Sequence, residues 1–294
     1  MTDGALLLDK PVGPSSNAVL QRAKALLGAR KAGHAGTLDP LASGLLLVLF
    51  GEATKFAGLL LDAEKEYLAT LKLGETTATG DAEGEVLERR AVKVSQARLH
   101  EALRKFHGTI EQLPPMHSAL KRDGVPLYKL ARKGVQVARE RRRVQILALE
   151  SLRFEPPWLE LRIRCSKGTY IRTLAEDIGA ELGTGAHLAA LRRTASGGFR
   201  LEDAISLQAL QELPAPARRE RLLPLSALLA GLPRAELDAG SEARLRSGQT
   251  LKISGLEEGL YAVVRKDGAL IGLGRAEDGA LRPLRLTQAA DLHR

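Results

Sequence analysis

Hydrophobic and polar positions alternate along two segments of the chain, which is the pattern of a strand with one buried face. In the first segment, Lys65 to Leu73, the apolar members are Tyr67, Ala69, Leu71 and Leu73. In the second segment the apolar members are Leu159, Leu161, Ile163 and Cys165, and charged residues stand between them. A third strand is predicted at Leu45 to Phe50, where the unbroken apolar run indicates that both faces are covered.

Apolar positions at helical spacing predict three helices. Ser15, Ser16 or Asn17 can cap the first helix, whose apolar positions are Val19, Leu20, Ala23, Leu26 and Leu27 before Gly28 ends it. Ser95 caps the second helix, which contains Leu99, Leu103 and Phe106. The third begins near Tyr170, and its buried stripe is Ile171, Leu174, Ile178 and Leu182. Because helices and strands mix without a regular βαβ repeat, the sequence predicts an α+β fold.

The other segments of the sequence indicate a short helix, a loop, a linker and a second, smaller domain. A short helix is expected from Thr54 towards Leu61, and Gly74 to Gly84 is expected to be a loop. The stretch from Glu212 to Leu223, rich in Pro and Arg, is typical of a linker. Short alternating runs follow it and predict a small β-barrel: Leu251 to Ile253, Leu260 to Arg265 and Leu270 to Gly274. We therefore expect a large domain over residues 1–222 and a small one over 223–294.

Basic residues exceed acidic ones, with 44 Lys and Arg against 35 Asp and Glu in 294 residues, a formal net charge of +9. The excess is concentrated between Lys121 and Arg143, where only Asp123 and Glu140 are acidic. Such a cluster favours a polyanionic partner, whereas the alternative is an ordinary solvated face.

The single cysteine, Cys165, excludes an internal disulfide and offers no zinc-ligand spacing. A reducing compartment, the cytoplasm, fits this cysteine usage. The N-terminal region has no basic leader, and no apolar stretch reaches the ~18 residues that a membrane span requires. We therefore expect a soluble protein.

Asp39 stands in a block rich in glycine, directly before the buried apolar run. Pro40 disfavours the α region for the residue before it, so extended backbone is expected at Asp39. The glycines of the block, Gly33, Gly36 and Gly44, allow other backbone or a bulky ligand to come close. A lone carboxylate is thus presented at the mouth of a buried strand. The alternative is an aspartate that only closes a turn.

Arg172 is the second candidate for chemistry. A turn of small residues, Ser166 to Thr169, places Tyr170 and Arg172 just past the end of a strand, where side chains can face a ligand. If Arg172 meets Asp39, the guanidinium would hold the carboxylate ionised and oriented. The alternative is that Arg172 pairs only with Glu176, four residues further on.

Six motifs, taken together in order over about residues 5 to 200, resemble the bacterial TruB family of tRNA pseudouridine synthases. They are Leu6 to Pro11 with Gly13 and Ser15 to Asn17; Gly33 to Gly44; Gly51 to Lys55; Lys65 to Tyr67; Cys165 to Arg172; and Gly185 to His187 through Leu191 to Arg193. The resemblance implies a mixed, mainly antiparallel sheet flanked by helices, the pseudouridine synthase fold, followed by a small PUA-like RNA-binding domain.

The resemblance also implies roles for single residues. Asp39 matches the catalytic aspartate, which acts at C1′ of the target nucleotide while the base detaches at N1, turns and rejoins through C5. Arg172 matches the arginine that pairs with this acid, and Tyr67 matches a tyrosine that stacks on the uracil. Tyr170 and Leu191 match positions that line the pocket, although core packing is an alternative role for Tyr67 and Leu191. His34 matches a histidine that fills the space left by the flipped base.

Residues 114–143 correspond to a mobile insertion of the family that closes over the T arm of tRNA. Its phosphate-contacting candidates are Lys121, Arg122, Arg132, Lys133, Arg141 and Arg142. His117 stands where the family more often has a tyrosine, which leaves the strength of that contact open.

The function expected from this resemblance is isomerisation of uridine 55 in the T loop of tRNA to pseudouridine. No cofactor or metal, no membrane and no obligatory protein partner is expected, and the chain is expected to act as a monomer. Two alternatives stay open: a tRNA-binding or RNA-folding module with secondary catalysis, and a guide-dependent synthase acting on ribosomal RNA. A glycosidase is disfavoured because hydrolysis usually needs two placed carboxylates and the sequence offers one.

Overall fold

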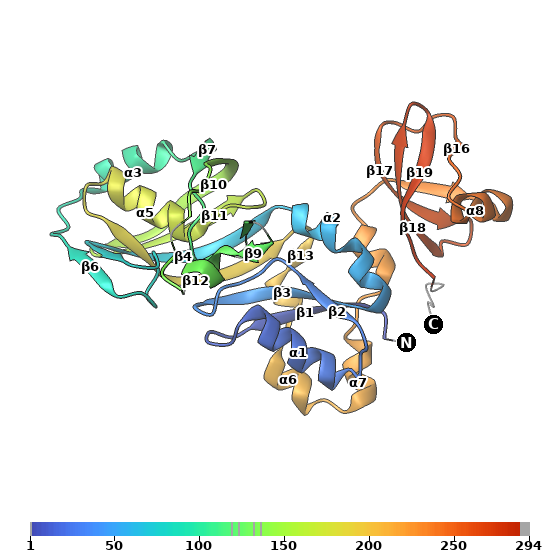
Figure 1. Ribbon diagram of the computed structural model, residues 1–294, viewed down its shortest axis with the longest axis horizontal. Helices are drawn as coiled ribbons and strands as arrows, with labels where there is room; N and C mark the ends of the chain where they lie inside the picture. Colours follow the sequence, from blue (N-terminus) through green and yellow to red (C-terminus); the bar gives the residue numbers. More distant parts are fainter. Residues whose placement is uncertain (1, 119, 123, 132, 136, 289–294) are drawn as a thin grey trace. The chain divides into compact units, whose positions relative to one another are not determined.

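A computed structural model describes residues 2–118, 120–122, 124–131, 133–135 and 137–288 (Figure 1). Contacts within the chain divide it into two compact units. The first unit contains Met1–Leu38, Leu46–Leu61 and Asp203–Arg294, and the second contains Asp39–Leu45 and Asp62–Glu202. Strand β3 (Ala42–Phe50) therefore begins in the second unit and ends in the first.

A mixed, mainly antiparallel sheet forms the second unit, as the fold prediction required. Its strands follow the order β3, β12, β4, β11, β10 and β7. Only the pairing of β3 with β12 is parallel among these neighbours, and the others are antiparallel. The bounds are β4 (Lys65–Leu73), β7 (Gly108–Gln112), β10 (Arg142–Glu155), β11 (Trp158–Cys165) and β12 (Ala186–Ser196).

One face of this sheet is covered by helices. The alternation predicted for β4 is confirmed: Tyr67, Ala69, Leu71 and Leu73 are all buried. Helix α5 (Ile171–Glu181) packs on β4 and β12, and helix α3 (Gln96–Arg104) packs on α5 (Figure 1). Ser95 caps α3 by accepting a hydrogen bond from the Arg98 N–H, as predicted. The buried positions on β4 and the helices above them make the core of this unit.

The predicted loop from Gly74 to Gly84 is partly wrong, because β5 (Glu75–Thr77) pairs with β6 (Val86–Arg89). All four residues of β6 are exposed, so no alternation of apolar and polar positions marks the strand. The basic segment carries three short elements: β8 (Lys121–Arg122), β9 (Val125–Pro126) and α4 (Leu127–Ala131). A two-residue strand, β13 (Phe199–Arg200), pairs with the end of β12.

The first unit contains the strand order β14, β1, β3, with β2 paired to the last residues of β3. Ser15 caps helix α1 by accepting from the Ala18 N–H, which confirms the predicted start. The helix expected from Thr54 is instead a 3-10 helix, η1, followed by α2. The bounds are β1 (Gly4–Lys10), α1 (Ser16–Leu26), β2 (Ala32–Ala35), η1 (Gly51–Phe56), α2 (Ala57–Asp62), η2 (Leu201–Asp203), β14 (Ile205–Ser206), α6 (Leu207–Glu212) and η3 (Leu225–Leu229).

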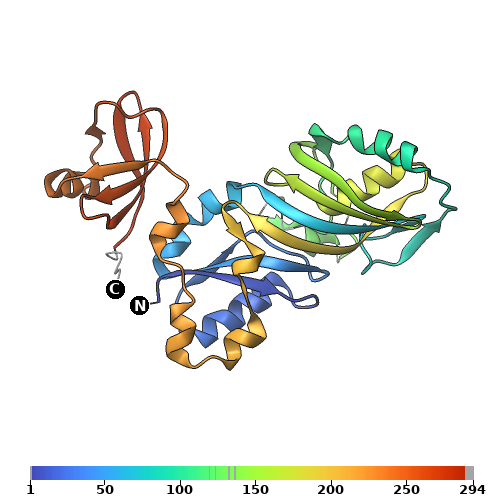
Figure 2. The same ribbon diagram turned by 180° about the vertical axis from the view of Figure 1, so that it is seen from behind.

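The predicted linker from Glu212 to Leu223 contains a helix, α7 (Ala215–Glu220). The Arg218 guanidinium donates to the main-chain oxygens of Leu210, Gln211 and Leu26. The segment is therefore attached to α6 and to the end of α1, and these two helices lie side by side in both views (Figure 1, Figure 2). The prediction of a linker was wrong, because composition does not show that Arg218 finds main-chain carbonyl oxygens as hydrogen-bond acceptors on neighbouring helices.

The last part of the first unit is a separate five-stranded sheet in the order β15, β17, β18, β19, β16. Its elements are β15 (Arg234–Leu237), α8 (Ala239–Arg246), β16 (Leu251–Lys252), β17 (Gly259–Arg265), β18 (Leu270–Glu277) and β19 (Ala280–Leu286). Buried residues between Ala235 and Leu281 form a core cluster of their own. This curled sheet fits the expected small β domain, while the boundary at residue 222 stays a prediction.

Gly44 is required where β3 meets β12. Its φ of +99° lies in a region that side chains disfavour, and a Cβ atom there would overlap the main-chain oxygen and nitrogen of Arg193. The predicted role of Gly44, close approach of another backbone, is thus confirmed, whereas a Cβ on Gly33 would meet only Thr54 at 3.9 Å.

Gly44→Ala is expected to lower the free energy of unfolding by about 2 to 4 kcal/mol, because it combines a strained φ with a steric overlap. Gly58→Ala is the matched control, since a Cβ on this helical residue meets nothing within 4 Å. Urea denaturation of both variants measures the difference. Equal stabilities of the two variants would contradict the role assigned to Gly44.

Candidate active site

Asp39 lies between β2 and β3 and combines a structural role with an accessible carboxylate. Its main-chain oxygen accepts from the Ala42 N–H at 3.1 Å, which closes the turn before β3. Its side chain is 45% exposed, and Oδ2 lies 3.0 Å from Nη2 of Arg172. Asp39 therefore does more than close a turn, and the predicted contact with Arg172 is present.

Arg172 is almost completely buried, with 6% of its side chain exposed. Besides Asp39, its guanidinium contacts Oδ2 of Asp81 through Nε at 3.6 Å. Nη1 donates to the Thr79 carbonyl at 3.1 Å, and Nη2 donates to the His117 carbonyl at 2.7 Å. Pairing with Glu176 alone is therefore excluded. Two carboxylates and two carbonyl oxygens surround a cation that would otherwise be costly to bury.

Asp81 is a site residue that sequence reasoning missed. Its side chain is 5% exposed, and its Oδ1 accepts from the Thr79 hydroxyl and from the Glu83 N–H. The main chain around it is tied to β12, because the Ala82 N–H donates to the Leu188 oxygen at 3.0 Å. No periodic pattern surrounds Asp81 in the sequence, so only the folded chain reveals that it faces Arg172.

Tyr67 and Leu191 lie on neighbouring strands of the same sheet. Leu191 on β12 is in register with Ala42 of β3 and Ala69 of β4, and it is half-buried. Burial raises the pKa of the Tyr67 hydroxyl, while the charge of Arg193 and its hydrogen bond to the tyrosine act in the opposite direction. Tyr67 is 9% exposed, so packing accounts for part of its role. The assignment of both residues to a uracil pocket stays a prediction.

Tyr170 is the residue from which α5 starts, as predicted. Its side chain is half-buried, and burial raises the pKa of its hydroxyl. Of the stripe expected on α5, Ile171, Leu174 and Ile178 are buried, while Leu182 is half-buried just past the last helical residue. Arg172, expected to lie off this stripe, is itself buried because its guanidinium turns towards the carboxylates.

His34 lies in the middle of β2, paired with Val48 of β3, and is half-buried in the first unit. Its expected place behind a flipped base stays a prediction.

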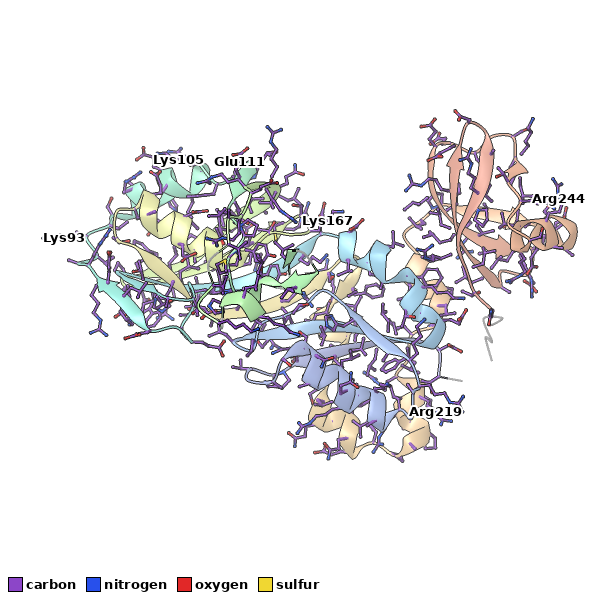
Figure 3. The ribbon with its side chains drawn as sticks, in the orientation of Figure 1. Lys93, Lys105, Glu111, Lys167, Arg219 and Arg244 are labelled. Atoms are coloured by element: carbon purple, nitrogen blue, oxygen red, sulfur yellow. The ribbon has the colours of Figure 1, made fainter. Side chains whose placement is uncertain are left out.

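The basic candidates occupy different positions. Lys133, Arg141 and Arg142 are exposed, Lys121 and Arg122 form β8, and Arg132 lies outside the described residues. Figure 3 labels two further exposed charges nearby in the chain, Glu111 of β7 and Lys167 of the turn before α5, and Lys167 pairs with Asp62 at 2.8 Å. A role of the basic residues in binding phosphates stays a prediction.

The arrangement places one partly exposed carboxylate, that of Asp39, in contact with Arg172. Asp39 is partly exposed beside a buried guanidinium, and a carboxylate in that position can attack an electron-poor carbon or accept a proton. The second carboxylate, Asp81, is buried and bound to Arg172, which leaves it unable to serve as the acid that glycoside hydrolysis requires. Within the described ranges, no cluster of three or more His, Cys, Asp or Glu side chains could hold a metal ion.

Comparison with known families covers most of the chain. Residues 24–171 match the TruB family pseudouridylate synthase (N terminal domain), and residues 172–230 match the tRNA pseudouridylate synthase B C-terminal domain. Residues 233–287 match the family described as pseudouridine synthase II TruB, C-terminal. None of the helices in the described residues is long and apolar enough to cross a membrane.

Curated relatives are similar over almost their whole length. The tRNA pseudouridine synthase B of Thiobacillus denitrificans is 55% identical over 284 residues, which is 97% of this chain and 95% of the relative. The protein of the same name from an Azoarcus species is 53% identical over 287 residues, 97% of this chain and 95% of the relative.

Solved structures share the fold at lower identity. A chain from a Cbf5-Nop10-Gar1 complex aligns with a TM-score of 0.76 and 27% identity, covering 99% of this chain and 85% of that chain. A chain from an H/ACA RNP bound to a substrate RNA containing 2′-deoxyuridine aligns with a TM-score of 0.72 and 28% identity, covering 94% and 78%.

The two carboxylates beside Arg172 are expected to differ in their contribution to stability. Asp81→Asn removes one charge of a buried pair and should lower the free energy of unfolding by about 3 kcal/mol. Asp39→Asn should change it by about 1 kcal/mol or less, because Asp39 is partly hydrated. Chemical denaturation of the two variants tests this order, and a larger loss for Asp39→Asn would refute it.

Proposed function

The chain belongs to the TruB family of pseudouridylate synthases, and from this premise we propose that it converts uridine 55 in the T loop of tRNA to pseudouridine, with Asp39 as its catalytic residue. The observation that carries the assignment of Asp39 is its 3.0 Å contact with the buried Arg172, which leaves the carboxylate partly exposed. Asp39 is therefore oriented by Arg172 and accessible.

The reaction requires three changes at the target nucleotide. The N1–C1′ bond breaks, the detached uracil turns, and a C5–C1′ bond forms while C5 loses its proton and N1 gains one. Asp39 either attacks C1′ or removes the proton at C2′, and a carboxylate fixed by Arg172 suits both routes. Atoms are only rearranged, so the mass of the RNA does not change.

The neighbouring side chains have supporting roles in this proposal. Tyr67 stacks on the uracil, and Tyr170 and Leu191 line the pocket that keeps the free base in place. His34 recovers part of the unstacking cost by occupying the space that the flipped base leaves. The sheet register supports the placement of Tyr67 and Leu191 on adjacent strands.

A transfer RNA substrate is favoured over a guide-dependent one. The relatives named tRNA pseudouridine synthase B are 53% to 55% identical to this chain, whereas the chains from the complexes named above are 27% and 28% identical. We propose that the chain acts on tRNA in the cytoplasm as a monomer, without a protein partner or cofactor. A protein that only binds tRNA is disfavoured, because Asp39 combines a partly exposed carboxylate with a close contact to Arg172.

Phosphate contacts are assigned to the basic insertion, residues 114–143. Lys133, Arg141 and Arg142 are exposed there. A Lys or Arg that neutralises a phosphate releases a counterion from the nucleic acid, which favours binding. Lys121, Arg122 and Arg132 are proposed for the same surface on sequence grounds. The small β domain is proposed to add RNA contacts.

Asp39→Ala is expected to abolish pseudouridine formation on unmodified tRNA, because it removes the carboxylate that this proposal places at C1′ or C2′ of the nucleotide. Carbodiimide treatment followed by primer extension maps the product. Asp203→Ala, at an exposed aspartate of η2, is the control and should retain activity. Undiminished product from Asp39→Ala would reject the assignment, and no product from the unmodified protein would reject the function.

The double variant Arg141→Ala, Arg142→Ala is expected to weaken tRNA binding and to reduce the slope of log Kd against log salt by about 1 to 2, as the loss of two phosphate contacts requires. Arg153→Ala is the matched control on the same strand, since Arg153 already pairs with Glu155. Filter binding over a range of salt concentrations measures both slopes. An unchanged slope in the double variant would remove these residues from the RNA surface.

A further inference from the structure

The side chain of Gln112 binds both main-chain groups of Tyr170, 58 residues further along the chain. Its Oε1 accepts from the Tyr170 N–H at 3.0 Å, and its Nε2 donates to the Tyr170 carbonyl at 3.2 Å. Gln112 is the last residue of β7 and is 1% exposed. The buried amide therefore uses one donor and one acceptor on a single residue.

The attachment holds the residue that precedes helix α5, and this residue supplies no side-chain cap. Tyr170 is the capping residue by position, but its side chain makes no capping hydrogen bond. The first turn of any helix has N–H groups without partners inside the helix, so its start is held by outside contacts. Thr173 adds a second link, since its Oγ1 donates to the Leu113 carbonyl at 3.5 Å.

The attachment adjoins the ion pair of the site. Arg172 follows Tyr170 by two residues, and its Nη2 contacts both Asp39 and the carbonyl of His117. His117 lies five residues after Gln112, on the chain that continues from β7. The guanidinium is therefore held by its own helix and by the segment that contains His117. Gln112 is connected to both, because its amide binds Tyr170 and its main chain leads to His117.

We propose that Gln112 is a positioning residue for pseudouridine formation: by fixing the start of α5, it directs the Arg172 guanidinium towards Asp39. The kinetic part of this inference rests on the proposed function. Gln112 acts through Tyr170 and Arg172 and does not touch the substrate. A displacement of about 1 Å in a group that orients a reacting atom can cost about 100-fold in rate, so a small movement of α5 is sufficient.

The chemistry of the amide suggests two informative substitutions. Gln112→Leu has a similar size but removes the acceptor of the Tyr170 N–H, while the Tyr170 carbonyl keeps the hydrogen bond from the Leu174 N–H. Gln112→Glu keeps the acceptor and the shape but replaces the donor that faces the Tyr170 carbonyl. Gln145→Glu makes the same chemical change on an exposed side chain of β10 and is the matched control.

Single-turnover rates on unmodified tRNA and the Kd for tRNA separate positioning from binding. We expect both Gln112 variants to lose about 10- to 100-fold in rate while Kd stays within about threefold, as misorientation without loss of RNA contacts requires. Gln145→Glu should match the unmodified protein. Rates within about threefold of the unmodified protein, or a rate loss matched by an equal loss of affinity, would overturn the inference.

A crystal structure of Gln112→Glu tests the geometry without any substrate. The contact between Asp39 and Arg172, 3.0 Å in the unmodified chain, should lengthen or be lost. An unchanged contact would overturn the inference. If the unmodified protein forms no pseudouridine, the proposed function fails while this comparison still decides the role of Gln112. If Gln112→Leu does not fold, Gln112→Glu carries both measurements.

Discussion

The buried charge of Arg172 is the constraint on which the arrangement of the site depends. The positive charge of a side chain that is 6% exposed requires nearby negative charge or hydrogen-bond acceptors. Four groups from three segments of the second unit provide them. Asp39 comes from the turn before β3, Asp81 and the Thr79 carbonyl from the connection after β5, and the His117 carbonyl from the segment after β7. Each of these segments is therefore held in a defined position around one side chain.

The two carboxylates that contact Arg172 differ in burial and in their hydrogen bonds, and this difference gives them different roles in the proposal. Asp81 accepts hydrogen bonds from Thr79 and Glu83 and is buried, so it neutralises the arginine and stays in place. Asp39 is 45% exposed and keeps oxygen surface available to a substrate. One carboxylate can thus stabilise the cation while the cation orients the other carboxylate.

The β sheet determines where the remaining candidates lie. Tyr67 and Leu191 belong to the adjacent strands β4 and β12, and Gly44 allows β3 to approach β12 because it carries no side chain. Helix α5 packs on β4 and β12, and Gln112 attaches its capping residue, Tyr170, to β7. Catalytic, pocket and positioning residues in this proposal therefore lie on this sheet or directly beside it, while Arg141 and Arg142, at the start of β10, are exposed.

The sequence by itself determined the local features of this protein. The alternation in β4 and β11, the cap at Ser95 and the start of α5 near Tyr170 depend on neighbouring residues, and six motifs together indicated the family. For α1 the sequence left Ser15, Ser16 and Asn17 open, and the structure selected Ser15. Only the tertiary structure decided the partners of Arg172, the involvement of Asp81, the exposed hairpin strand β6 and the attachment of Tyr170 to Gln112. These depend on contacts between distant residues, where burial and hydrogen-bond geometry, which no local pattern encodes, select the partner.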